Sequence, residues 1–200
     1  MKNISIIEEI NEGNEVYLRK ISSDDADFFF ESLREEAISR YLSLGPLVSQ
    51  SYSKKLLKKY EKFWEEKVQF NYVIELRGKN HDRKNIKKVG VISLWRISWL
   101  HNRAEIGIWI TPKYWNMGLA KRALNLIKIV GFVHLKLNRL EAHIAVENKR
   151  SINLFKSKEV AFFEEGILKQ YLNLRGIYHN AVALSYLKEN WNGSDRLTNE

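Results

Sequence analysis

The segment from Arg103 to Ser157 constrains the fold of this chain more than any other part of its sequence. Residue patterns predict a strand, a glycine-containing turn, a helix, a second strand and a second helix over 103–111, 114–120, 120–135, 139–146 and 149–157. A helix that starts directly after such a turn leaves its first N–H groups without internal partners. An anion can bind to these groups, and a phosphate is the natural occupant.

The whole chain predicts one domain. Two hundred residues, 44% of them hydrophobic, can bury one core, and no linker rich in Pro, Gly or Ser divides the chain. Further strands are predicted at 15–21, 71–76, 86–99, 160–165 and 177–187, and further helices at 28–33, in a short segment ending near Leu42, and at 49–68. We therefore expect an α/β (α+β) fold with a mixed, mostly antiparallel seven-stranded sheet flanked by helices. The domain is expected over 1–191, and a polar tail over 192–200.

Several classes of protein are excluded by composition. The chain has no cysteine, which rules out disulfides, a thiol nucleophile and Cys-based zinc sites, and its five histidines lack metal-ligand spacing, so no metal is expected. The N-terminal charges come too early for a signal peptide, and no apolar run reaches the ~18 residues that span a bilayer. We expect a cytoplasmic protein with no membrane partner.

Charge is unevenly distributed along the chain. The formal net charge is +9, yet residues 22–40 hold six acids against Arg34 and Arg40, a net charge of −4. This acidic region either attracts a cationic partner or is a solvated helix face. The run from Arg77 to Lys88 holds six Lys or Arg, but no aromatic residues interleave with them, so nucleic-acid contact is not expected.

Two motifs carry a family resemblance. The turn Trp115-Asn116-Met117-Gly118-Leu119-Ala120 is similar to the Gln/Arg-x-x-Gly-x-Gly/Ala pattern of the GNAT N-acetyltransferase superfamily. Its leading Trp resembles the RimJ/RimL-type branch, which acetylates protein N-termini. The segment from Asn148 to Phe155 resembles the superfamily's Asn-x-x-Ser-x-x-x-Tyr/Leu element. The likeness covers about 15–191 and implies a GNAT fold with acetyl-CoA as co-substrate.

The resemblance also assigns residues to the co-substrate. It implies contacts from Ile108, Trp109, Ile110, Asn116, Met117, Gly118, Leu119, Ala120, Lys121, Asn148, Ser151 and Phe155. Small residues at the turn let backbone N–H groups approach the pyrophosphate. Phe155 stands where many members place a Tyr that protonates the leaving thiolate, and Lys158 to Phe162 replaces the family's Leu-Gly-Phe. Because Phe donates no proton, water or the ammonium product would supply it.

A candidate base lies on the strand before the turn. Alternation places Glu105, Gly107 and Trp109 on one face, and a carboxylate there can take a proton from an attacking amine through a water. The alternative is a half-buried Glu paired with Arg103 or a cross-strand Lys. Glu141 is the second candidate. Backbone N–H groups around Trp109 and Ile110 would hold the thioester oxygen.

The acceptor is left open by the sequence. An α-amine has a pKa of about 8 against ~10.4 for Lys, so a site with one Glu and no Tyr fits a protein or peptide N-terminus, including that of a ribosomal protein. A polyamine or other small amine fits the acidic region. A non-catalytic module that binds acyl-CoA or the ribosome is the third interpretation. The chain is expected to be a monomer or homodimer.

Overall fold

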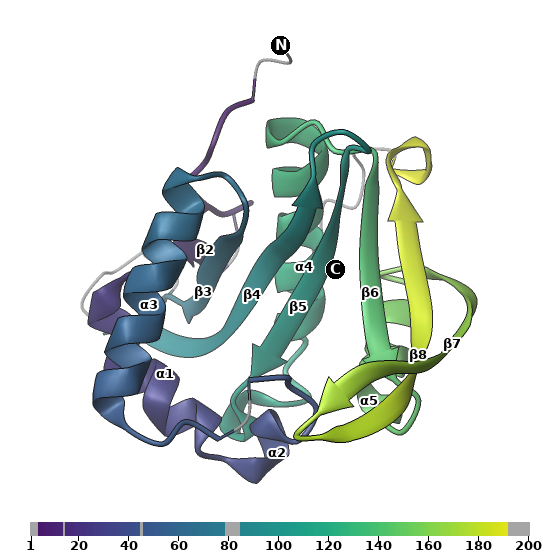
Figure 1. Ribbon diagram of the computed structural model, residues 1–200. Helices are drawn as coiled ribbons and strands as arrows, with labels where there is room; N and C mark the ends of the chain where they lie inside the picture. The colour runs from purple at the N-terminus through teal and green to yellow at the C-terminus, as the bar shows by residue number, and fades with distance from the viewer. Residues whose placement is uncertain (1–3, 14, 45, 79–84, 192–200) are drawn as a thin grey trace.

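One mixed sheet organises the molecule. The computed structural model describes residues 4–13, 15–44, 46–78 and 85–191, so the predicted tail lies outside the described residues. Within them the strand order is β1-β2-β3-β4-β5-β6-β8-β7, antiparallel at every step except β5–β6 (Figure 1). The strands are β1 Glu9–Ile10, β2 Val16–Lys20, β3 Phe70–Leu76, β4 Lys87–Ser98, β5 Arg103–Ile110, β6 Arg139–Ala145, β7 Phe163–Leu174 and β8 Ile177–Leu187.

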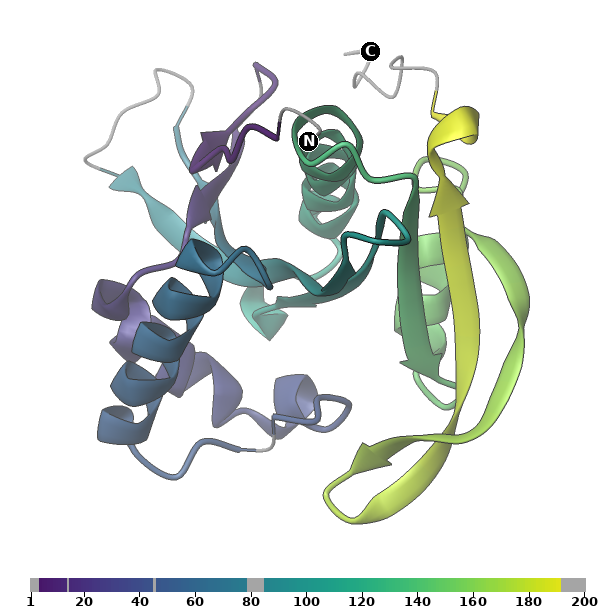
Figure 2. The same cartoon turned by 45° about the horizontal axis from the view of Figure 1, so that its top comes forward.

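Helices cover both faces of the sheet. They are α1 Ala26–Leu33, α2 Glu36–Ser39, α3 Gln50–Glu65, α4 Leu119–Ile129 and α5 Lys149–Lys156, with a π-helical turn, Val130–His134, extending α4. As Figures 1 and 2 show, α1 and α3 lie over β2 to β4 on one face, and α4 lies behind β4 and β5 on the other. The larger hydrophobic core packs under α4, and a second core, including Phe29, Leu57 and Val73, packs under α1 and α3.

The strands β5 and β6 separate soon after they meet. Their parallel register holds only three pairs, from Arg103 opposite Arg139 to Glu105 opposite Glu141. Beyond this point β5 stays paired with β4, and β6 stays paired with β8. Figure 1 shows the two strands diverging toward their carboxyl ends. Each strand therefore exposes backbone groups toward the space between them.

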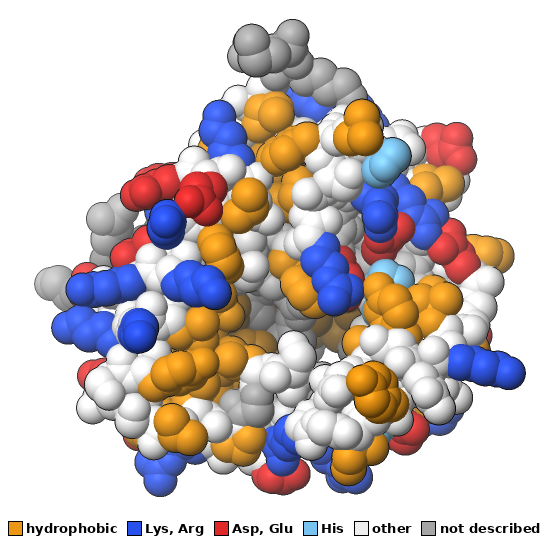
Figure 3. Space-filling model, in the orientation of Figure 1, with side chains coloured by type: hydrophobic (Ala, Val, Ile, Leu, Met, Phe, Trp, Pro, Cys, Tyr) orange, Lys and Arg blue, Asp and Glu red, His pale blue; other side chains and the backbone are white. Residues whose placement is uncertain are grey.

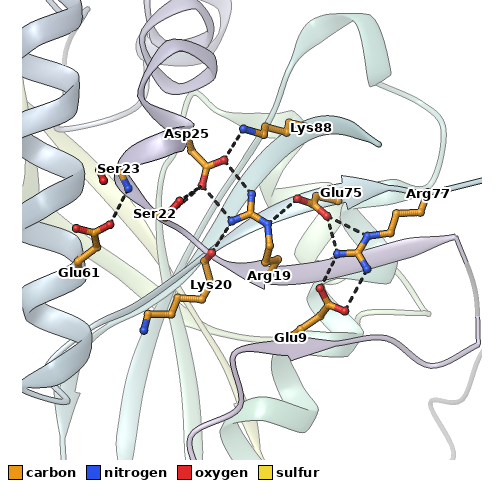
Figure 4. Close-up of polar contacts among 10 residues, drawn as sticks. All are labelled: Glu9, Arg19, Lys20, Ser22, Ser23, Asp25, Glu61, Glu75, Arg77 and Lys88. Carbon is orange, nitrogen blue, oxygen red and sulfur yellow. Dashed lines mark hydrogen bonds and ion pairs between the residues drawn. The ribbon is translucent and has the colours of Figure 1, made fainter. Parts of the chain in front are cut away.

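A chain of buried ion pairs joins the first strands to the start of α1 (Figure 4). Arg19 on β2 contacts both Asp25, in the short 3-10 turn η1 (Ser23–Asp25), and Glu75 on β3, at 2.8 and 2.7 Å. Glu75 also accepts from Arg77 at 2.7 Å, and Lys88 lies 2.6 Å from Asp25. Two cations of the predicted basic run, Arg77 and Lys88, are thus held inside the fold, while 79–84 lie outside the described residues.

The largest departure from the predicted elements concerns β7. The strand predicted over 160–165 is confirmed only for 163–165, because Val160 and Phe162 are buried in a loop and Phe162 N–H donates to Phe155 O at 2.9 Å. The strand begins at Phe163 and continues to Leu174, with register shifts that conceal its alternation. The two-residue β1 was not predicted, so the observed sheet has one strand more than expected.

Candidate functional site

The predicted turn folds as a 3-10 turn, η3 Pro112–Tyr114, followed by Trp115 and the start of α4. The Trp115 indole N–H donates to Ile110 O at 2.6 Å, which fixes the turn to the end of β5. The Arg150 guanidinium lies 3.7 Å from the centre of the Trp115 ring, and it donates to Asn116 Oδ1 at 3.2 Å. The turn and the start of α5, which lie far apart in sequence, are therefore in contact.

The geometry of the turn fits a phosphate. Gly118 is the N-cap of α4 with φ of +72°, a left-handed conformation that favours glycine, and a Cβ there would meet nothing within 4 Å. Asn116 also has positive φ, at +62°. Among the described residues no backbone acceptor is found for the N–H groups from Asn116 to Leu119. Exposed donors at a helix N-terminus are the arrangement that binds an anion.

The start of α5 supplies the predicted polar cap. Asn148 Oδ1 accepts from the Ser151 N–H at 3.2 Å, so the predicted capping by Asn148 is confirmed. The Phe155 side chain, one of the predicted co-substrate contacts, points into the core. It is 2% exposed and packs edge-on against Phe162, with ring centres 5.0 Å apart. Lys121, one of the predicted co-substrate contacts, is paired with Glu159 at 2.7 Å.

The diverging strand β5 offers two backbone donors. Thr111 N–H donates to Val89 O at 2.8 Å. Because N–H directions alternate along an antiparallel strand, Trp109 N–H also points toward β4, whereas Ile108 and Ile110 N–H point toward the space beside β6. Of the backbone N–H groups predicted to hold the thioester oxygen, those of Ile110 and Ile108 point toward the space beside β6, and that of Trp109 does not. The Trp109 side chain instead packs against Phe28 and Phe29 of α1.

Glu105 lies at the point where the two strands separate. It is 5% exposed, and its Oε2 lies 3.2 Å from the Arg96 guanidinium of β4 and 3.2 Å from Nδ1 of His143 on β6. Tyr171 of β7 completes the cluster, because its ring centre lies 4.6 Å from that of His143 and its hydroxyl lies 3.2 Å from the Arg96 guanidinium. The expected partners, Arg103 or a cross-strand Lys, are not the ones observed.

Sequence reasoning missed Arg96, His143 and Tyr171. The signal available for His143 was its spacing, since Arg139, Glu141 and His143 alternate with buried Leu140 and Ala142. Nothing in the sequence indicated that β7 would bring an aromatic ring to this strand. The three side chains come from three strands that meet only in the folded sheet.

Glu141, the second candidate base, is already occupied. Arg103 lies 2.7 Å from its Oε2 and Arg139 lies 2.6 Å from its Oε1. Burial opposes its charged form, but the hydrogen bonds from Arg139 and Arg103 outweigh this and hold the pKa of Glu141 below its usual value. A carboxylate so stabilised takes up a proton less readily, so Glu105 is the better placed of the two.

An acid-bearing wall faces the site from α1 and α2. Five acids of this region are exposed: Asp24 in η1, Asp27 and Glu31 on α1, Glu35 between the two helices, and Glu36 on α2. Asp25, in contrast, is 1% exposed and belongs to the ion-pair chain. An open cleft of about 560 Å³ lies between α1 and η3, and its lining includes the acids Glu31 and Glu35 together with the cations Arg34, Lys88 and Lys113. The β7–β8 hairpin forms the opposite wall, and its Arg175 reaches α2 by donating to Ser39 Oγ at 2.9 Å. Figure 3 shows this face hollowed near its centre, with hydrophobic side chains around the hollow.

Comparison with known proteins identifies the family. The family model described as "Acetyltransferase (GNAT) domain" matches residues 15–157. The chain belongs to the GNAT acetyltransferase family. It is an N-acetyltransferase that acts on amines, and acetyl-CoA is its acetyl donor. The free N–H groups of the turn and the open space at Gly118 fit the phosphates of that donor.

Individual GNAT relatives resemble most of the chain. The spermidine N(1)-acetyltransferase of Escherichia coli K12 is 28% identical over 84% of this chain and 84% of its own length. A crystal structure of spermidine N-acetyltransferase from Vibrio cholerae, in complex with CoA and spermine, has a TM-score of 0.74 at 25% identity and covers 88% of this chain and 98% of that one. RimJ of Mycobacterium smegmatis, solved with CoA-disulfide, has a TM-score of 0.80 at 21% identity, covering 92% and 88%, and shows likeness of fold alone.

No group of three or more His, Cys, Asp or Glu side chains in the described part of the chain is arranged to hold a metal ion. In the same residues, no helix is both long and apolar enough to cross a membrane.

Proposed function

We propose that this GNAT domain transfers the acetyl group of acetyl-CoA to a primary amine of a polyamine such as spermidine. The observation that carries the proposal is the position of Glu105, which lies where β5 and β6 diverge, on the face bordered by the acidic α1–α2 wall. Two of the relatives that match most of the chain are spermidine acetyltransferases, and one of them was solved with spermine, which supports the same acceptor class.

The acidic wall supports a cationic acceptor. Glu31 is balanced by Arg34 at 3.3 Å and Glu36 by Arg175 at 3.4 Å. Glu35 is exposed, belongs to the lining of the cleft and has no ion-pair partner among the residues the structure describes. A polyamine carries several positive charges along a flexible chain, so it can contact separate carboxylates while one amine reaches the base. The aromatic rings of Phe28 and Tyr114 in the same cleft suit the intervening methylene groups.

Each residue has a defined task in this proposal. The N–H groups of the turn hold the phosphates of the donor, and Ile108 and Ile110 N–H orient its carbonyl oxygen. Glu105 takes a proton from the amine through a water as the nitrogen–carbon bond forms and the carbon–sulfur bond breaks. Water protonates the departing thiolate, since Phe155 is buried and donates no proton.

A protein or peptide N-terminus is the second candidate acceptor. The Trp115 motif favours it, and its α-amine is deprotonated more easily than a polyamine nitrogen. A panel of acceptors tests the choice: spermidine, spermine, and peptides with free or blocked N-termini, with release of coenzyme A as the readout. We expect spermidine to give the highest kcat/KM. A free peptide that outperforms both polyamines would contradict the proposal.

The role of Glu105 is tested with one variant and one matched control. Glu105→Gln keeps the shape of the side chain and removes the base, so we expect kcat to fall by about 10²–10⁴-fold. Glu141→Gln is the control, because Glu141 is already paired with two arginines and is expected to change stability more than kcat. Equal kcat for Glu105→Gln and the unaltered protein would exclude Glu105 as the base.

A further inference from the structure

We propose that Arg96, His143 and Tyr171 form a clamp that holds one oxygen of Glu105 and presents the other oxygen to the amine. These three are positioning residues, because they act through Glu105. The inference rests on the proposed role of Glu105 as the base. It adds the β7–β8 hairpin, through Tyr171, to the parts of the fold on which catalysis depends.

The contacts of Glu105 with Arg96 and His143 converge on one carboxylate oxygen. The Arg96 guanidinium and His143 Nδ1 each lie 3.2 Å from Glu105 Oε2. Oε1 has no contact of this kind with any other described residue, and it is not among the buried polar atoms that lack a partner. The side chain as a whole is only 6% exposed. The carboxylate is therefore fixed through Oε2, and Oε1 is the oxygen left to accept a proton.

His143 faces Glu105 through one of its ring nitrogens. Its Nδ1 is buried and faces Oε2 at a poor hydrogen-bond angle, and it has no other hydrogen-bond partner in the described part of the chain. A buried ring nitrogen without a better partner is costly, so a small ring rotation that completes the bond to Oε2 is favourable. The side chain keeps 12% of its surface exposed, which leaves room for that rotation.

Tyr171 contacts both His143 and Arg96. Its ring lies over His143, and its hydroxyl contacts the same Arg96 guanidinium that holds Glu105. The guanidinium also lies 4.4 Å from the centre of the Trp95 ring. Arg96 has φ of +48°, and it lies between Trp95 and Ser98, where the register of β4 with β5 shifts. This irregularity turns the Arg96 side chain toward the cluster, as β-bulges do elsewhere.

The charged and titratable groups around His143 come from four strands, whereas the residue of β8 that pairs with His143 is the apolar Ala183. Glu105 lies on β5, Arg96 on β4, Glu141 and Arg139 on β6, and Tyr171 and Glu165 on β7. Arg139 engages both Glu141 and Glu165, and Arg103 also engages Glu141, so two arginines balance these two acids. Glu105 is the remaining carboxylate that faces the imidazole.

Paired variants of His143 test the clamp. His143→Leu removes the nitrogen that faces Oε2, and His143→Asn keeps an N–H in a similar position. We expect kcat of His143→Leu to fall by up to about 100-fold with little change in the KM for acetyl-CoA, and His143→Asn to retain most of kcat. The deficit of His143→Leu should shrink as pH rises, because more of the acceptor amine then loses its proton unaided. A folded His143→Leu with unchanged kcat at every pH would overturn the proposal.

Variants of Tyr171 and Glu105 distinguish an error in the clamp from an error in the assignment of Glu105 as the base. Tyr171→Phe keeps the tilted ring in contact with His143 but loses the contact with Arg96, so a smaller loss of kcat is expected than for Tyr171→Ala. If Glu105→Gln loses activity while the His143 and Tyr171 variants do not, the clamp is wrong and the base assignment stands. If Glu105→Gln is fully active, the base assignment itself is wrong, and the clamp fails with it.

A measurement without turnover gives independent evidence. Nitrogen-15 NMR of labelled imidazole distinguishes which ring nitrogen of His143 carries the hydrogen. We expect the Nδ1–H tautomer in the unaltered protein and a shift toward Nε2–H in Glu105→Gln, because Nδ1 then loses its charged acceptor. A predominant Nε2–H tautomer in the unaltered protein would contradict the clamp.

Discussion

At the scale of single residues, Phe155 shows how burial limits what a side chain can contribute. Its position in the motif indicated a place beside the reacting thiolate, but the structure places it against Phe162 inside the core. Restoring a tyrosine therefore adds a hydroxyl group to an apolar environment. The identity of a motif residue predicts a function only if the backbone also directs that residue to the site.

Phe155→Tyr is expected to lower stability without raising kcat. An unpartnered buried hydroxyl costs roughly 1–3 kcal/mol, which urea unfolding would measure. Turnover of spermidine at saturating concentrations of both substrates would measure kcat. An increase in kcat together with unchanged stability would show that position 155 reaches the leaving group after all.

At the scale of elements, the start of α5 has a structural role, and we expect it also to contribute to binding of the donor. Asn148 caps the helix, and the next turn holds Arg150 against Trp115. Ser49 provides a matched control, because its hydroxyl caps α3, and not α5, by accepting from Tyr52 N–H at 3.1 Å. The two caps allow loss of helix stability to be separated from loss of ligand binding.

Asn148→Ala and Ser49→Ala are both expected to lower the free energy of unfolding by about 1 kcal/mol. Only Asn148→Ala should also raise the KM for acetyl-CoA, because that helix start touches the turn. Chemical denaturation and initial-rate kinetics would measure the two effects. If both variants raised this KM alike, Asn148 would have no binding role beyond its cap.

The ion-pair chain at the start of α1 makes stability depend on pH. Burial opposes the charge on Asp25, but hydrogen bonds from Arg19, Lys88 and Ser22 outweigh it and hold its pKa below the usual 3.8. A carboxyl whose pKa is lowered by folding stabilises the protein above its unfolded pKa, and this contribution is lost as pH falls through the folded pKa. The contribution of Asp25 is thus complete at neutral pH.

Asp25→Asn is therefore expected to cost about 3 kcal/mol at pH 7. Urea unfolding repeated at lower pH should show the difference from the unaltered protein shrinking below about pH 4. Asp24→Asn, a change at the exposed neighbour, serves as the control. A difference that stayed constant down to pH 2 would mean that packing, and not charge, accounts for the effect.

At the scale of the whole molecule, charge is divided between an acidic wall and a basic remainder. The net charge is +9, yet the α1–α2 region that faces the site is negative. The KM for spermidine is expected to rise several-fold between 0.05 and about 0.5 M salt, because screening weakens the attraction of exposed carboxylates. A neutral primary amine of similar size is the control acceptor. An equal rise for both acceptors would remove the electrostatic explanation.

Local signals and long-range contacts differ in how far the sequence reveals them. The turn, the cap at Asn148 and the strand bearing Glu105 follow from neighbouring residues, so the sequence predicted them. The partners of Glu105 depend on how β4, β6 and β7 meet, and the start of β7 was misplaced because Val160 and Phe162 are apolar without being in a strand. The alternation of β7 is further obscured by its register shifts near Glu164 and Leu168.

The brief pairing of β5 with β6 has a consequence for stability. In the described part of the sheet, strand pairing between the β1–β5 half and the β6–β8 half is limited to three residue pairs. A donor molecule bound between these strands would act as a non-covalent crosslink, adding stability that grows with its concentration, about 2.7 kcal/mol at 100 times its Kd. We expect the donor to add this stability where the pairing between the two halves of the sheet is short.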